Sequence, residues 1–158
     1  MKITDIKTAV VAYHGHATLV RIDTDEGIYG IGEANPDAGA AAIVGLISEL
    51  KHELIGEDPR NVEYCWDKLR KAHIFSGAQW GVFLIALSGI EIALWDLAAK
   101  AAGQPLYRMM GGKYRDKVRL YGDCGDGDEK SGSPAGCAAR AKRMVAEGFT
   151  ALKFDIDN

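Results

Sequence analysis

Two residues of opposite charge stand close together in the stretch GFTALKFDID, residues 148–157. This stretch is typical of a β-strand entered from a glycine, and strand side chains alternate between two faces. Lys153 and Asp155 therefore share one face, opposite Leu152, Phe154 and Ile156. A lysine can act as a general base where burial and a nearby cation lower its pKa from about 10.4 toward 7. The alternative is a buried ion pair with a purely structural role.

Three other chemically suggestive motifs are incomplete. GIYGIGEA contains Gly-x-Gly, but Asn35 stands where a dinucleotide fingerprint needs its third glycine. GGKY carries the lysine of a phosphate loop, but Tyr114 replaces the required serine or threonine. DGDEK resembles the start of a calcium loop, yet Lys130 occupies its third ligand position. These motifs predict neither a nucleotide site nor a calcium site.

The composition excludes several classes of partner. A formal net charge of −3 over 158 residues gives no basic surface for nucleic acid or anionic lipid. No apolar stretch approaches the ~18 residues that span a membrane, and residues 82–102 are interrupted by charges. The three cysteines are widely spaced without a C-x-x-C pair, which favours reduced thiols in the cytoplasm. We therefore expect a cytoplasmic protein without nucleic-acid or membrane partners.

The first part of the sequence predicts an antiparallel sheet followed by helices. Residues 2–33 read as a three-stranded meander, with strands at 17–22 and 28–33 joined by a turn rich in aspartate. Apolar residues at helical spacing then predict three helices, over 36–54, from Asn61, and over 79–102. The third is nearly all apolar, so we expect it to be the buried centre of this region.

The pattern changes after the third helix. VRLYG (118–122) predicts a strand, residues 134–147 a helix and residues 150–156 a second strand. Such a βαβ unit implies two parallel strands. Two strands cannot cover both faces of a parallel sheet, so the second domain is incomplete in this sequence.

Several stretches together resemble the mandelate racemase/muconate-lactonizing enzyme branch of the enolase superfamily. The most specific is LSGIEIALWDLAAKAAGQPLYRMMGG, residues 87–112. Three more occur in the expected order: TDEGIYGIGEA, LIGEDPRNVE and RDKVRLYGD. GFTALKFDID falls where the second barrel strand of that family would be. Trp95 and Asp96, within the first stretch, are interpreted as a core residue and a polar structural anchor.

The resemblance implies an α+β capping domain over residues 1–115, followed over 116–158 by the first βαβ unit of a (β/α) barrel. A complete barrel typically takes ~250 residues, so we expect the barrel domain to be truncated in this sequence. The family binds Mg²⁺ through carboxylates on later strands, whose counterparts we expect beyond Asn158. The resemblance also implies a homo-oligomer and a small carboxylate substrate.

Family members abstract a proton next to a carboxylate and form an enediolate. The resemblance assigns Lys153 and Asp155 to catalysis, with Lys153 as the base. Much of the branch has Lys-x-Lys here, and Lys-x-Asp is closer to some sugar-acid dehydratases. We therefore expect a Mg-dependent aldonate or aldarate dehydratase. The alternatives are a racemase, epimerase or cycloisomerase, or a non-catalytic fragment, and we expect the 158-residue segment alone to be inactive.

The capping domain of the family contributes two loops to substrate specificity. The first corresponds to residues 13–16 and the second follows the third strand. The resemblance assigns Tyr13, His14, His16 and Asn35 to substrate binding, because their donors and acceptors suit a polyhydroxylated acid. Asp123, at the end of the first barrel strand, is also assigned to the substrate site.

Overall fold

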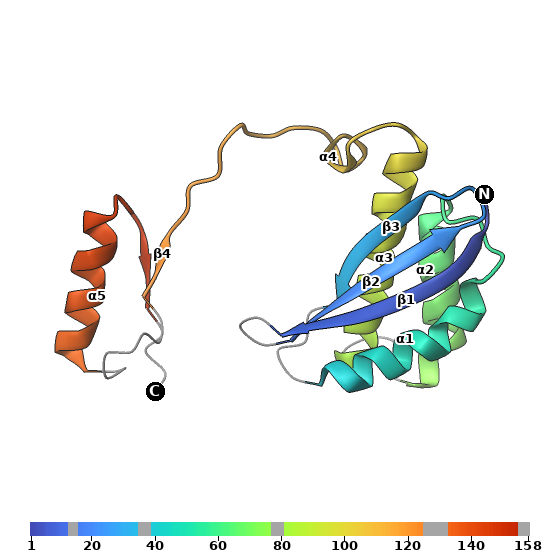
Figure 1. Ribbon diagram of the computed structural model, residues 1–158, viewed down its shortest axis with the longest axis horizontal. Helices are drawn as coiled ribbons and strands as arrows, with labels where there is room; N and C mark the ends of the chain where they lie inside the picture. Colours follow the sequence, from blue (N-terminus) through green and yellow to red (C-terminus); the bar gives the residue numbers. More distant parts are fainter. Residues whose placement is uncertain (13–15, 35–38, 77–80, 125–132, 155–158) are drawn as a thin grey trace. The chain divides into compact units, whose positions relative to one another are not determined.

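The computed structural model describes residues 1–12, 16–34, 39–76, 81–124 and 133–154. Its contacts divide the chain into two compact units, Met1–Gly112 and Lys113–Asn158. Within the described residues the first unit contains a three-stranded sheet and the second a two-stranded sheet (Figure 1). The predicted class, an α+β domain followed by the start of a parallel α/β unit, is confirmed.

The sheet of the first unit is the predicted antiparallel meander. Strands β1 (Ile3–Ala12), β2 (His16–Thr24) and β3 (Tyr29–Ala34) lie in the order β1-β2-β3. The hairpin between β2 and β3 closes where the hydroxyl of Thr24 donates to the carbonyl oxygen of Ile28 at 2.6 Å. Gly27 takes a φ of 77°, the left-handed conformation that this turn needs and that glycine adopts without strain.

Three helices cover one face of this sheet (Figure 1). They are α1 (Ala40–Leu54), α2 (Val62–Ala72) and α3 (Gly81–Ala101). Helix α3 packs on β3 and β2, α1 packs on β1 and α3, and α2 packs on α3. A short 3₁₀ helix, η1 (Ile74–Ser76), precedes α3, and the one-turn helix α4 (Leu106–Met109) follows it. Side chains along each strand alternate between the two faces of the sheet. Those on the face that the helices cover include Ile6, Val20 and Ile22, which are buried.

Helix α3 is the centre of the core, as its composition predicts. Ten of its residues are buried, among them Leu87, Ile90, Leu94 and Leu97. By length and hydropathy alone it also qualifies as a candidate membrane span, but its packing against the sheet and two helices identifies it as a core helix of this unit. It ends at Ala101 and is followed by Gly103, whose φ is 63°, and the Gln104 N–H donates to the Ala99 carbonyl.

Glycines bring β3 and α3 unusually close together. A Cβ built on Gly30 would lie 2.0 Å from the carbonyl oxygen of Ala93, and one on Gly32 would lie 2.1 Å from that of Gly89. A Cβ on Gly89 would in turn lie 2.7 Å from the Cβ of Ala34. The Gly-x-Gly of GIYGIGEA thus has a packing role, because any larger residue would push the strand off the helix.

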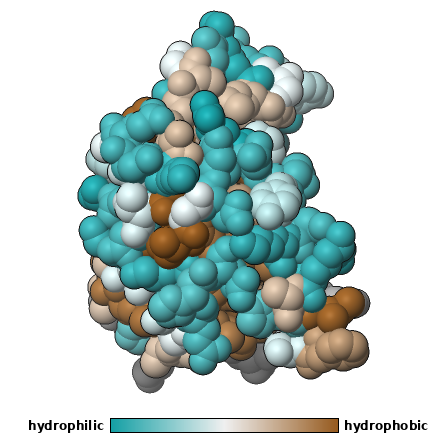
Figure 2. Space-filling model, turned by 90° about the vertical axis from the view of Figure 1, so that its right-hand side faces the viewer, coloured by the Kyte–Doolittle hydropathy of each residue, from teal (hydrophilic) through white to brown (hydrophobic). Residues whose placement is uncertain are grey.

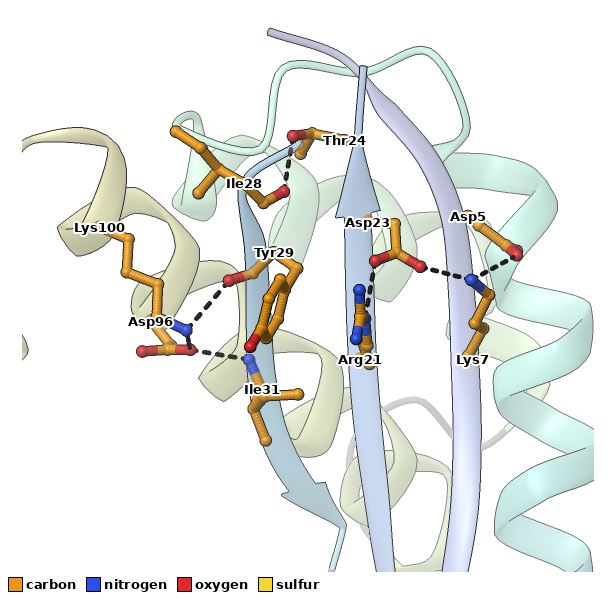
Figure 3. A network of polar contacts seen from close by, with 10 residues as sticks. All are labelled: Asp5, Lys7, Arg21, Asp23, Thr24, Ile28, Tyr29, Ile31, Asp96 and Lys100. Carbon is orange, nitrogen blue, oxygen red and sulfur yellow. Dashed lines mark hydrogen bonds and ion pairs between the residues drawn. The ribbon is translucent and has the colours of Figure 1, made fainter. Parts of the chain in front are cut away.

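Two side chains of α3 complete the outer edge of β3 (Figure 3). The carboxylate of Asp96 accepts a hydrogen bond from the backbone N–H of Ile31 at 2.8 Å. Lys100 donates to the Tyr29 carbonyl oxygen at 3.0 Å and to Asp96 at 2.6 Å. A row of unpaired backbone groups at a sheet edge invites pairing with another chain, and these contacts occupy part of that row.

The uncovered face of the sheet carries a chain of charges at one end (Figure 3). Asp23 accepts from Lys7 and from Arg21, each at 2.7 Å. Lys7 also lies 3.7 Å from Asp5, which pairs in addition with Lys51 of α1. The hydrogen bond from Lys7 is the main reason that the pKa of Asp23 lies below its usual value. Figure 2 shows another side of the molecule, on which hydrophilic side chains surround smaller hydrophobic patches.

Helix α1 begins later than the sequence predicts. The prediction placed its start at Pro36, which lies outside the described residues. The structure begins the helix at Ala40, after Gly39 with a φ of 89°. A left-handed residue cannot continue a right-handed helix, so Gly39 sets the boundary. The other two helices start within two residues of their predicted positions, α2 at Val62 and α3 at Gly81.

The second unit has the predicted strand, helix and strand. Strands β4 (Gly122–Asp123) and β5 (Leu152–Lys153) pair in parallel, with helix α5 (Pro134–Ala146) between them in the chain. The prediction of a strand over 118–122 was wrong in extent, because pairing to β5 is confined to Gly122 and Asp123. Ser133 caps α5 by accepting from the Gly136 N–H at 3.1 Å.

Candidate functional site

The candidate site lies on the parallel pair of strands in the second unit. Asp123 and Lys153 are register partners, as are Gly122 and Leu152. The Gly122 N–H donates to the carbonyl of Ala151 and the Cys124 N–H to that of Lys153, both at 2.9 Å. These two bonds flank Asp123 on β4 and fix where it stands relative to Lys153.

Packing against α5 determines which way the site faces. A Cβ on Gly122 would lie 3.0 Å from the sulfur of Met144, so this side of β4 is turned toward α5. Alternation along the strands then places Asp123 and Lys153 on the opposite side. Both side chains are exposed there, by 55% and 44% respectively. This is the arrangement that the alternation in GFTALKFDID predicts for Lys153.

The two side chains form an ion pair. The Nζ atom of Lys153 lies 3.4 Å from Oδ2 of Asp123. The sequence analysis assigned Asp155 to catalysis together with Lys153, and Asp155 lies outside the described residues. It missed Asp123 as a partner because the two residues are thirty positions apart. Only the register of the βαβ unit, which a single sequence does not reveal, brings them together.

The approach to β5 is fixed by an arginine. Arg119 donates through Nη2 to the carbonyl oxygen of Thr150 at 2.6 Å, and through Nε to its hydroxyl at 3.1 Å. A guanidinium can make two such bonds at once because its donors lie in one rigid plane. Arg119 thus ties the segment before β4 to the segment before β5, which supports the register of Asp123 and Lys153.

The predicted specificity residues lie mostly outside the described part of the chain. Tyr13, His14 and Asn35 lie outside the described residues, as does Asp155. His16 is described: it is exposed at the first position of β2, opposite Ala12 at the last position of β1. Since Ala34 at the end of β3 pairs with Thr18, both predicted specificity segments leave the same end of the sheet.

The described residues offer no ligand set for a metal ion. Across residues 1–12, 16–34, 39–76, 81–124 and 133–154, no three His, Cys, Asp or Glu side chains are placed to share one. A divalent hard cation such as Mg²⁺ needs several oxygen ligands around it. The pair of Asp123 and Lys153 brings one carboxylate and one cation, so these residues do not fit a magnesium centre by themselves.

Curated proteins with sequences similar to this chain include sugar-acid dehydratases. The chain is 41% identical over 157 residues to a D-xylonate dehydratase of Haloferax volcanii, a match that covers 99% of this chain and 37% of the relative. It is 37% identical over 155 residues to a D-galactonate dehydratase of Verminephrobacter eiseniae, covering 98% of this chain and 38% of the relative. The chain therefore spans well under half the length of these curated relatives.

Solved structures agree with the sequence matches. A mandelate racemase/muconate lactonizing enzyme-like protein from Rubrobacter xylanophilus superposes with a TM-score of 0.87 at 41% identity, over 99% of this chain and 42% of that one. An enolase superfamily member from Salmonella Typhimurium gives 0.87 at 40% identity, over 98% and 42%. The family model for the mandelate racemase/muconate lactonizing enzyme N-terminal domain matches residues 2–111. The chain belongs to the mandelate racemase/muconate lactonizing enzyme family of the enolase superfamily.

Proposed function

We propose that the whole protein is a sugar-acid dehydratase that acts on an aldonic or aldaric acid. The observation that carries this proposal is the match to relatives named as D-xylonate and D-galactonate dehydratases, which covers 98–99% of the chain. The match extends through the second unit, so it includes the strand that bears Lys153. The proposal also assigns residues 1–115 to a capping domain and 116–158 to the start of the barrel.

Lys153 acts in this proposal as the base. Its neutral amine takes the proton from the carbon next to the substrate carboxylate, and the electron pair of that C–H bond moves into the carboxylate to give an enediolate. The enediolate expels the hydroxyl of the following carbon, which leaves as water with a proton from a general acid. The enol that remains becomes a 2-keto-3-deoxy acid. Asp155 and the residues Tyr13, His14, His16 and Asn35 complete the proposed site.

Magnesium dependence is part of the same proposal. No three His, Cys, Asp or Glu side chains of the described residues are placed to share a metal ion. The family resemblance assigns the proposed ligands to residues beyond Asn158. A cation bound there would stabilise negative charge that develops on the substrate carboxylate. Lys153, for its part, has to be deprotonated before it can accept the substrate proton.

The proposal is tested with the full-length protein, magnesium and a panel of aldonic and aldaric acids. A dehydratase yields a product lighter by one water, whereas a racemase or epimerase yields a product of unchanged mass. Lys153→Ala should lower kcat by about 100- to 10 000-fold, the usual contribution of a general base. Asp116→Asn, on an exposed residue of the same unit, is the matched control. Near wild-type turnover in Lys153→Ala would contradict the assignment.

A further inference from the structure

Asp123 contacts the side chain that the proposed reaction depends on. We propose that Asp123 is a positioning residue, whose carboxylate holds the amino group of Lys153 at the carboxyl end of β5. The sequence analysis assigned Asp123 to substrate binding, and the contact with Lys153 at 3.4 Å supports this different role. The inference rests on the proposed function in one respect only, that Lys153 is the base.

The backbone fixes the two residues side by side. They are register partners on parallel strands, where neighbouring strands lie about 4.8 Å apart. The hydrogen bonds from Gly122 and Cys124 to β5 flank Asp123, so neither strand can slide without breaking them. Side chains of partnered residues project from the same face of a parallel pair. The contact between them at 3.4 Å therefore follows from the sheet itself.

A lysine base needs such a contact. Its amino group sits at the end of four flexible methylene groups and has no preferred position of its own. Proton abstraction requires the reacting atoms within about 3–3.5 Å, and a displacement of about 1 Å can cost about 100-fold in rate. The neutral amine can still donate an N–H to the Asp123 carboxylate. Because this carboxylate is fixed to the neighbouring strand, it restricts the amino group to one side of β5. Asp123 acts on the reaction through Lys153 and does not touch the substrate.

Positioning and substrate binding have different kinetic signatures. Loss of a positioning residue lowers kcat, because fewer bound complexes hold the amine within reach of the substrate proton. Loss of a substrate contact that is equal in the ground state and the transition state raises KM and leaves kcat unchanged. Measurement of kcat and KM for a single variant at Asp123 therefore distinguishes positioning from substrate binding.

The decisive experiment compares Asp123→Asn, Asp123→Glu and the control Asp116→Asn in the full-length protein. We expect Asp123→Asn to lower kcat by about 10- to 100-fold with KM changed less than about twofold. A substrate deuterated at the carbon next to the carboxylate should still show a primary isotope effect. Asp123→Glu should restore part of kcat, because its carboxylate can still reach the amine. A raised KM with unchanged kcat, or no effect in Asp123→Asn, would overturn the inference.

A second measurement does not depend on turnover. Acetic anhydride labels the amine of Lys153, and mass spectrometry compares it with Lys142 on α5, which is exposed in the same unit. An ion pair protects the amine, so Asp123→Asn should raise the ratio of Lys153 to Lys142 labelling by roughly two- to fivefold. An unchanged ratio contradicts the contact. If Lys153→Ala remains active while the ratio does rise, the proposed base is wrong and the contact stands.

Discussion

The carboxylate of Asp96 in helix α3 accepts a hydrogen bond from the backbone N–H of Ile31 on the edge strand β3. This bond joins the core helix to β3, which is one of the two edge strands of the meander. Asp96 and the preceding Trp95 belong to the stretch, residues 87–112, that most specifically resembles the family. The sequence analysis interpreted Asp96 as a polar structural anchor, and the structure shows that it occupies part of a sheet edge, a role that the sequence did not predict.

Removal of this carboxylate should weaken the fold. Asp96→Ala leaves the Ile31 N–H without its acceptor and removes one of the two acceptors of Lys100, so the free energy of unfolding should fall by about 1–2 kcal/mol. Urea denaturation followed by circular dichroism measures the change. Asp67→Ala is the control: this aspartate pairs with Lys71 on the surface of α2, and its loss should cost less than about 0.5 kcal/mol. Equal losses in both variants would show that the edge bond is unimportant.

Alanine at Gly32 should be far more costly than alanine at Gly45. A Cβ at position 32 would overlap the Gly89 carbonyl, which belongs to the helix backbone and cannot rotate away. We expect a loss of about 3 kcal/mol or more, the upper range for overpacking. Gly45 is exposed in α1 with nothing within 4 Å of a built Cβ, so Gly45→Ala should stabilise by about 0.5–1 kcal/mol. Thermal denaturation of both variants gives the comparison, and similar melting temperatures would refute it.

Asp58 should titrate well below an ordinary aspartate. Arg60 donates to it through Nη2 at 2.6 Å and Nε at 2.9 Å, and these bonds are the main reason that its pKa falls to about 2. A pKa lowered in the folded state stabilises the fold above the unfolded value of 3.8, and this contribution is lost as the pH falls toward 2. Carboxyl ¹³C resonances measure the midpoint.

Two arginine variants test the cause of this shift. Arg60→Gln should move the Asp58 midpoint up toward 3.8, since the guanidinium no longer favours the carboxylate. Arg70→Gln removes a guanidinium that lies 3.8 Å from Asp67 instead, so it should leave the Asp58 midpoint in place. A wild-type midpoint near 3.8 would contradict the bidentate contact.

Cys65 should resist alkylation. Burial, with a smaller contribution from Glu57, raises the pKa of its thiol to about 11. The thiolate is the reactive form, so at pH 8 iodoacetamide should modify the half-buried Cys137 well before Cys65. Because the folded pKa is raised, the stabilisation is complete below about pH 9 and is lost as the pH rises through about 11. Equal labelling rates in the folded protein would contradict this, and equal rates are expected in urea.

Long periodic elements are predictable from this sequence, whereas partners across the chain are not. The meander and the buried helix α3 follow from alternation and apolar content, which act locally. Val118 and Leu120 suggested a strand by residue type, but each is 69% exposed and outside the paired stretch. Strand formation depends on a partner, and propensity alone does not supply one. For the same reason, the local sequence pattern did not predict the contact between Asp123 and Lys153.

The glycine contact between β3 and α3 has a consequence for engineering. Gly32 and Gly89 set a fixed distance between the backbones of β3 and α3. The position of Ala34, at the end of β3, therefore depends on this packing and not on the residues that follow it. The residues after Ala34 can then be exchanged for those of a relative without changing the pairing of β2 and β3. Chimeras that exchange this connection should keep the melting temperature of the parent. If the proposed function holds, they should also change which acids the full-length protein accepts. The stability of the fold and the substrate selectivity could then be changed independently.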